Sequence, residues 1–90
     1  MIFRTSPQAD EDIANLYVAG AWRFGVAQAE RSQDGLFSAF QMLADNPRMA
    51  RERCELTPPV RLHPYQAPMI IDIEEEAGVL IVHVLHSRKD

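Results

Sequence analysis

The sequence predicts an α+β fold in which an antiparallel helical hairpin packs on a small, mainly antiparallel sheet, in the order β-α-α-β-β-β. Apolar residues recur at spacings of three and four through residues 9–24 and again through 29–43, which is the spacing of amphipathic helices. After residue 59 the pattern changes to short β-branched runs separated by turn residues, which is typical of strands. With 90 residues the chain can build one modest core, so we expect a single domain over residues 1–90.

Local signals set the ends of the predicted helices. Residues 1–4 form a short apolar run that we expect to be an edge or inserted strand. Ser6 can cap the first helix, with Pro7 at its first position, where the missing N–H has no partner to lose. Gly25 fits the residue just past the end of that helix, and Asn46 with Pro47 stops the second helix.

Two glycines lie inside the predicted helices. Gly20 and Gly35 each cost a helix interior about 1 kcal/mol relative to alanine. Close packing of one helix backbone on the other would compensate for this cost. Ala27 and Ala29 lie opposite Ala19 and Gly20 in an antiparallel hairpin, so we expect the two helices to approach closely near the turn.

Three strands should follow, over residues 60–65, 69–74 and 78–86. In the middle run Met69, Ile71 and Ile73 share one face, so alternation predicts one dry side of the sheet. The last run is apolar on both faces, which indicates a central strand covered on two sides. Simple alternation puts His83 beside the core residues of that strand, so we expect a hydrogen-bonded core histidine.

Charge and composition limit the function. A net charge of −4 argues against a protein that grips nucleic acid by its phosphates, so we expect no strong direct nucleic-acid binding. The apolar runs are far shorter than a membrane span, and a single cysteine, Cys54, agrees with a reducing compartment. We therefore expect a cytoplasmic protein that does not enter the membrane. His83 and His86 should point to opposite faces of their strand and no zinc spacing occurs elsewhere, so neither a metal nor a cofactor is expected.

Four sequence segments, in this order, make the chain resemble a known family. They are SPQADEDIANLY at residues 6–17, WRFG at 22–25, ADNP at 44–47 and VHVLHSRKD at 82–90. Together they are similar to the ParE branch of the ParE/RelE family of bacterial toxin-antitoxin systems, over nearly the whole chain. The resemblance implies a toxin held inactive by a cognate ParD-like antitoxin. The usual target of the ParE branch is DNA gyrase, whereas the RelE branch cuts mRNA on the ribosome.

The residues favour the ParE branch. Cutting RNA needs a base, an acid and cations that stabilise the charged phosphorane. Arg61 stands at the first arginine position of the family's strands, but APMII occupies the place of a second arginine and no tyrosine follows at the end. We therefore expect a gyrase poison without catalytic residues. The alternatives are a RelE-like ribosome-dependent endonuclease using Arg61, His86 and Arg88, and an inert family member that acts only as a binding partner.

Two sets of residues are candidates for contacts with partners. The candidates for contact with the target are cationic or histidine side chains near the end of the sheet: Arg61, His63, His86, Arg88 and Lys89. A solvated sheet edge, a structural hydrogen bond and a frayed tail are the structural alternatives for them. The candidates for contact with the antitoxin lie on a second apolar side of the hairpin: Ala14, Val18, Trp22 and Met42. Scattered surface residues are the alternative for this set.

Overall fold

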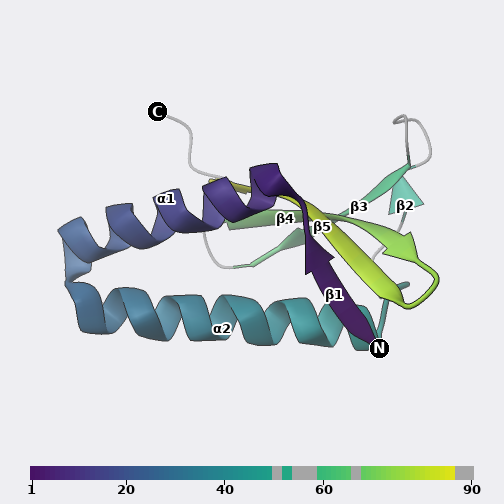
Figure 1. Cartoon of the computed structure of the whole chain (residues 1–90), viewed down its shortest axis with the longest axis horizontal. Coiled ribbons are helices and arrows are strands. Elements are labelled where there is room, and N and C mark those ends of the chain that lie inside the picture. The colour runs from purple at the N-terminus through teal and green to yellow at the C-terminus, as the bar shows by residue number, and fades with distance from the viewer. Residues whose placement is uncertain (50–51, 54–58, 66–67, 87–90) are drawn as a thin grey trace.

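The computed structural model describes residues 1–49, 52–53, 59–65 and 68–86, apart from the side chains of 52, 53 and 86. Two helices pack on a five-stranded sheet (Figure 1). The elements are β1 (Ile2–Thr5), α1 (Pro7–Phe24), α2 (Val26–Asp45), β2 (Glu52–Arg53), β3 (Val60–Pro64), β4 (Pro68–Glu75) and β5 (Gly78–His86). The predicted fold class and element order are confirmed, with the two-residue strand β2 as an addition.

The sheet has the order β1-β5-β4-β3-β2, and only the β1–β5 pair is parallel. β5 is thus an inner strand, as its two apolar faces indicated. The prediction that it is the central strand is wrong by one place, because β2 extends the sheet beyond β3 and leaves β4 in the middle.

The helix ends follow the local signals. The Ser6 hydroxyl accepts a hydrogen bond from the Ala9 N–H at 2.9 Å, and Pro7 is the first residue of α1. Gly25 joins the helices at φ +92°, a conformation that glycine adopts without steric cost. The two helices meet at Gly20 as predicted, but an added methyl group would lie 3.7 Å from Ala29 Cβ, an ordinary van der Waals contact, so this approach does not require glycine. Ala19 and Ala27 are exposed and take no part in the core.

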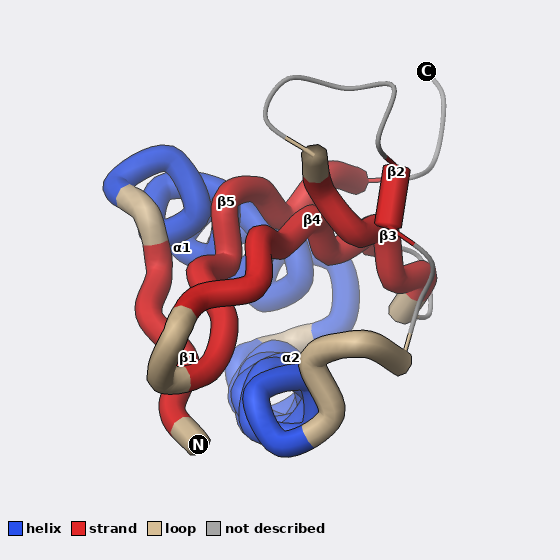
Figure 2. Tube along the Cα trace, turned by 90° about the vertical axis from the view of Figure 1, so that its right-hand side faces the viewer, coloured by secondary structure: helices blue, strands red, loops and turns tan. Residues whose placement is uncertain are grey.

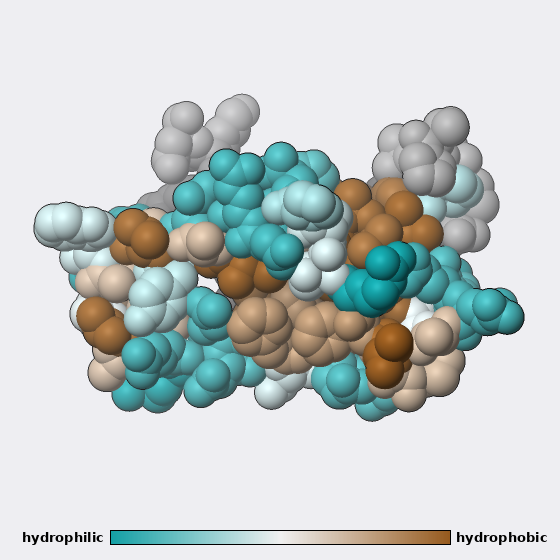
Figure 3. Space-filling view, viewed as in Figure 1, coloured by the Kyte–Doolittle hydropathy of each residue, from teal (hydrophilic) through white to brown (hydrophobic). Residues whose placement is uncertain are grey.

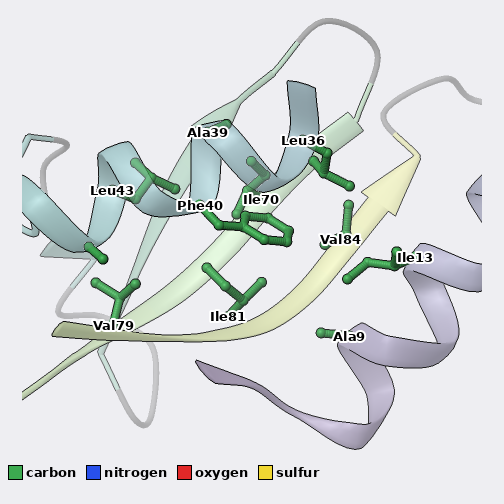
Figure 4. Packing of buried hydrophobic residues seen from close by; sticks show 11 residues of the cluster. Ala9, Ile13, Leu36, Ala39, Phe40, Leu43, Ile70, Val79, Ile81 and Val84 are labelled. Carbon is green, nitrogen blue, oxygen red and sulfur yellow. The ribbon is translucent and has the colours of Figure 1, made fainter. Parts of the chain in front are cut away.

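The core lies between the helices and one face of β4 and β5 (Figure 4). Phe40 of α2 is fully buried against Ile70, Ile81 and Val84 (Figure 4). Phe3 of β1 packs edge-on against the Phe40 ring, with 5.4 Å between the ring centroids. This apolar layer fixes which face of each strand is buried.

A β-bulge in β5 changes which side chains face the helices. Ile71 pairs with His83 but its neighbour Asp72 pairs with Ile81, so Val82 is the extra residue. Because of this insertion, Val84 and Ile81 both face the core, and His83 points to the other side of the sheet. The prediction that His83 shares the face of the core residues of its strand is therefore wrong.

The faces of β4 are also reversed from expectation. Ile70 and Asp72 face the helices and are buried, so Met69, Ile71 and Ile73 lie on the side away from the helices. The predicted dry side is thus the side that the described helices leave uncovered. The carboxylate of Asp72 can be buried on this side because one of its oxygens lies 3.2 Å from His63 Nε2 on the neighbouring strand. A polar group that has a hydrogen-bond partner can be buried at acceptable cost.

Candidate functional site

We call the side of the sheet that points away from α1 and α2 the open sheet face. Side chains of directly paired residues on neighbouring strands point to the same side of a sheet. The pairing of β3, β4 and β5 therefore shows which residues lie on the open sheet face. Its apolar residues are Val60, Leu62, Pro64, Met69, Ile71, Ile73, Leu80 and Leu85. In Figure 2 α2 is seen nearly end-on and lies below the strands β4 and β5. The open sheet face is a mainly apolar surface spanning three neighbouring strands.

The first turns of α1 close the edge of β5 where β1 ends. The β1–β5 pairing stops at Thr5 and Ile81. Beyond it the Ser6 N–H donates to the Ile81 carbonyl at 2.9 Å, and the Ser6 hydroxyl donates to the Val82 carbonyl at 2.7 Å. The carboxylate of Asp12 then accepts the Val84 N–H at 3.0 Å. The N-cap residue Ser6 and the α1 residue Asp12 thus replace a missing strand along this edge.

Asp12 also holds His83. The same carboxylate oxygen lies 3.0 Å from His83 Nδ1, and the other oxygen accepts a hydrogen bond from Gln8. Burial by itself would raise the pKa of Asp12, but the hydrogen bonds from Val84, Gln8 and His83 together hold this pKa below its usual value. Asp12 is therefore ionised at neutral pH and orients the imidazole.

Alternation along the last strand predicted that His83 is a core residue. The His83 side chain is hydrogen-bonded as expected, but 39% of it is exposed, so it is not a core histidine. The contact joins residues 71 positions apart, and no local pattern encodes it. The one sequence feature that could have indicated this contact is Asp12 in the second turn of α1. An acidic residue at this position is equally typical of an ordinary helix N-terminus.

Arg61 and His63 are buried, at 8% and 7% exposure, on the side of the sheet that faces the helices. His63 Nε2 lies 3.2 Å from Asp72 Oδ1, and Arg61 Nη1 donates to Glu74 at 3.3 Å. The other carboxylate oxygen of Asp72 is buried without a hydrogen bond among the described residues. The two candidates thus belong to a buried polar cluster rather than to a solvated sheet edge.

The other candidates for contact with the target lie outside the described residues. β5 ends at His86, whose side chain is not described, and Arg88 and Lys89 belong to the stretch 87–90. Their roles stay predictions.

The candidates for contact with the antitoxin form one stripe and one separate residue. Ala14, Val18 and Trp22 recur every four residues on α1 and all are exposed, Trp22 at 86%. Met42 is also exposed, but it lies 16 residues beyond the start of α2 at Val26, about 24 Å along that helix at 1.5 Å per residue. Figure 3 shows apolar side chains scattered over the hairpin and separated by hydrophilic ones. Three of the four residues thus form a stripe on α1, and Met42 lies on the other helix.

A groove with a volume of about 180 Å³ runs between α1 and α2 toward the end of the sheet. Among its walls are Ile13, Leu16, Phe24, Leu36 and Tyr65, and none of the described residues that line it is charged. A space of this size and polarity suits a single large apolar side chain.

Chemical sites of other kinds are not evident in the described part of the chain. No three histidine, cysteine or acidic side chains gather there in a way that could hold a metal ion. Neither described helix combines the length and apolar character needed to cross a membrane.

Comparison with known proteins identifies the family. A family model described as the ParE toxin of the type II toxin-antitoxin system parDE matches residues 3–90. A solved structure described as the chromosomal ParDE TA system from P. aeruginosa has the same fold, with a TM-score of 0.82 and 13% sequence identity. The alignment covers 98% of this chain and 97% of that one. No curated protein matches. The chain therefore belongs to the ParE toxin family of type II toxin-antitoxin systems.

Proposed function

We propose that this ParE-family protein inhibits DNA gyrase in the cytoplasm, without catalytic residues of its own, and that direct binding of a ParD-like antitoxin neutralises it. The observation that carries the proposal is the mainly apolar character of the open sheet face among the residues that the structure describes.

Cationic side chains on the open sheet face would favour an RNA target. Among the side chains that the structure describes on this face, Arg4 is ion-paired with Glu75 at 2.6 Å. Arg61, the first arginine of the nuclease pattern, is buried and bonded to Glu74. RNA cleavage needs cations that can reach a phosphate. An apolar surface of this kind suits contact with another protein, so we favour gyrase over ribosome-bound RNA.

The hairpin supplies the proposed antitoxin contact. Ala14, Val18 and Trp22 leave an apolar stripe in water, and covering it would contribute about 25 cal/mol per Å² of apolar surface buried. Exposed tryptophans are frequent anchors of protein interfaces. Met42 would add an exposed apolar side chain from α2 to this contact.

A gyrase assay with purified protein tests the proposed target. We expect cleaved plasmid to accumulate in the presence of gyrase and the toxin, and to disappear when the antitoxin is added. A reaction with neither cleavage nor loss of supercoiling would contradict the proposal.

Primer extension on ribosome-bound message provides the matching control for the RelE-like alternative. We expect no discrete cleavage of the message. Expression without the antitoxin addresses the third possibility, because an inert family member would leave growth unaffected.

A further inference from the structure

His83 differs from every other residue of β5 whose side chain is described. Residues 78–82 and 84–85 are glycine, valine, leucine or isoleucine, so His83 carries the one polar side chain in this part of the strand. The bulge at Val82 turns it to the open sheet face, where 39% of the side chain is exposed. A strand that is otherwise apolar thus presents a single polar group to the outside.

The imidazole is held in one orientation. Its Nδ1 lies 3.0 Å from the Asp12 carboxylate, which also accepts the backbone N–H of the next residue, Val84. An ionised carboxylate can only accept hydrogen bonds, so Nδ1 must carry the proton. In the neutral ring Nε2 is then a hydrogen-bond acceptor. Nε2 makes no hydrogen bond to any group in the described part of the chain.

The surroundings of His83 are those of a specific protein contact. Its cross-strand neighbour is Ile71, and Leu62 follows on the next strand over. In protein interfaces apolar area supplies most of the affinity, and a few fixed polar groups set the orientation of the partner. The alternative polar groups Arg61 and His63 lie on the other side of the sheet and are buried.

We propose that His83 is a specificity contact of this toxin, whose Nε2 accepts a hydrogen bond from an N–H or O–H group of the inhibited target protein. Asp12 is the positioning residue that fixes the ring. The inference rests on the proposed toxin function, and it assigns a role to a residue that the sequence pattern suggested to be structural.

The position of His83 separates target contact from antitoxin contact. With about 100° of turn per residue, Ala14 and Val18 point roughly 200° and 240° around α1 from Asp12, so both face away from the Asp12–His83 pair. Trp22 lies ten residues from Asp12, about 15 Å further along α1 at 1.5 Å per residue. Substitutions at His83 can therefore alter contact with the target while the proposed antitoxin surface on α1 is unchanged.

Two substitutions distinguish the two ring nitrogens. In His83→Asn the side-chain amide can still donate to Asp12, but no acceptor remains at the position of Nε2. In His83→Gln an amide reaches the position of Nε2, but the bond to Asp12 is lost. We expect His83→Asn to keep the thermal midpoint and the antitoxin affinity of the wild type and to lose about tenfold in toxic potency, the effect of one hydrogen bond. His83→Gln should instead lower the midpoint and retain more of the potency than His83→Asn.

Potency is measured as growth arrest at matched protein abundance, which does not depend on the identity of the target, and as gyrase-mediated plasmid cleavage. A His83→Asn protein as toxic as the wild type would overturn the inference, as would a joint loss of stability, antitoxin binding and toxicity. If the wild type arrests growth but causes no gyrase-mediated cleavage, gyrase is not the target. The role of His83 is then decided by comparing growth arrest by the wild type and by His83→Asn. A wild type that does not arrest growth would remove the proposed function and this contact with it.

Discussion

The two halves of β5 are held at the same edge of the sheet by different means. From Gly78 to Ile81 the strand pairs with β1 through a parallel backbone ladder. From Val82 to Val84 it is held by the side chains of Ser6, which caps α1, and of Asp12 in α1. A backbone ladder tolerates most substitutions because every residue supplies the same groups, whereas a side-chain cap can be lost through one substitution. The half that carries His83 is thus the half that single residues control.

Gly78 is the point at which the backbone-held half can be broken. A methyl group at this position would meet the Ile2 carbonyl oxygen at 1.7 Å, and the residue has φ +157°. We expect Gly78→Ala to separate β1 from β5 and to lower the free energy of unfolding by about 3 kcal/mol or more. Urea denaturation followed by circular dichroism measures the change.

Gly25→Ala is the matched control for this prediction. Gly25 has φ +92° but no atom lies within 4 Å of the added methyl group. It should therefore cost only the backbone strain, about 1–2 kcal/mol. Equal losses from the two substitutions would show that the contact with Ile2 is not the cause.

Removing Asp12 breaks the side-chain-held half. Asp12→Ala leaves the part-buried Val84 N–H without its acceptor and releases His83. We expect a loss of about 1–3 kcal/mol, the cost of an unsatisfied buried donor. Glu11→Ala, which removes an exposed acid one residue away, should change stability by less than about 0.5 kcal/mol. Hydrogen exchange at the Val84 amide should increase in the first variant only.

The Asp12 contact also predicts a dependence of stability on pH. Its pKa is lower in the folded protein than in the unfolded chain. The contribution of Asp12 to stability is therefore complete above the unfolded pKa, about 3.9 for an aspartate, and is lost as the pH falls through the folded pKa. Unfolding midpoints measured between pH 7 and the acid range should show this loss in the wild type. In Asp12→Asn this part of the acid sensitivity should be absent.

The smallest expected effects are those of alanine substitutions at the two glycines inside the helices, Gly20 and Gly35. A methyl group at Gly20 would lie in ordinary contact with Ala29, at 3.7 Å, so Gly20→Ala should stabilise the protein by up to about 1 kcal/mol. At Gly35 the methyl group would meet the Tyr65 hydroxyl at 2.5 Å. Gly35→Ala should gain less or destabilise, because Tyr65 must move. Thermal unfolding of both variants measures the difference, and an equal gain would mean that Tyr65 yields at no cost.

The sequence by itself determined the elements whose signals are local. Ser6 and Pro7 begin α1, Gly25 ends it and Asn46 ends α2, because capping and positive φ angles depend on a few neighbouring residues. The change of period near residue 59 was enough for the fold class and, with the family's sequence pattern, for the family. These features need no knowledge of which distant segments meet.

Tertiary structure alone decided which faces are buried and which histidine is accessible. The bulge at Val82 reverses the alternation of β5, and no residue in that run signals it. Arg61 and His63 are buried beside Glu74 and Asp72 on the next strand, which bond to them. His83 became accessible because Asp12, 71 residues away, holds it at the sheet edge. Such long-range pairings depend on the register of packed strands, which the spacing of residues along one segment does not encode.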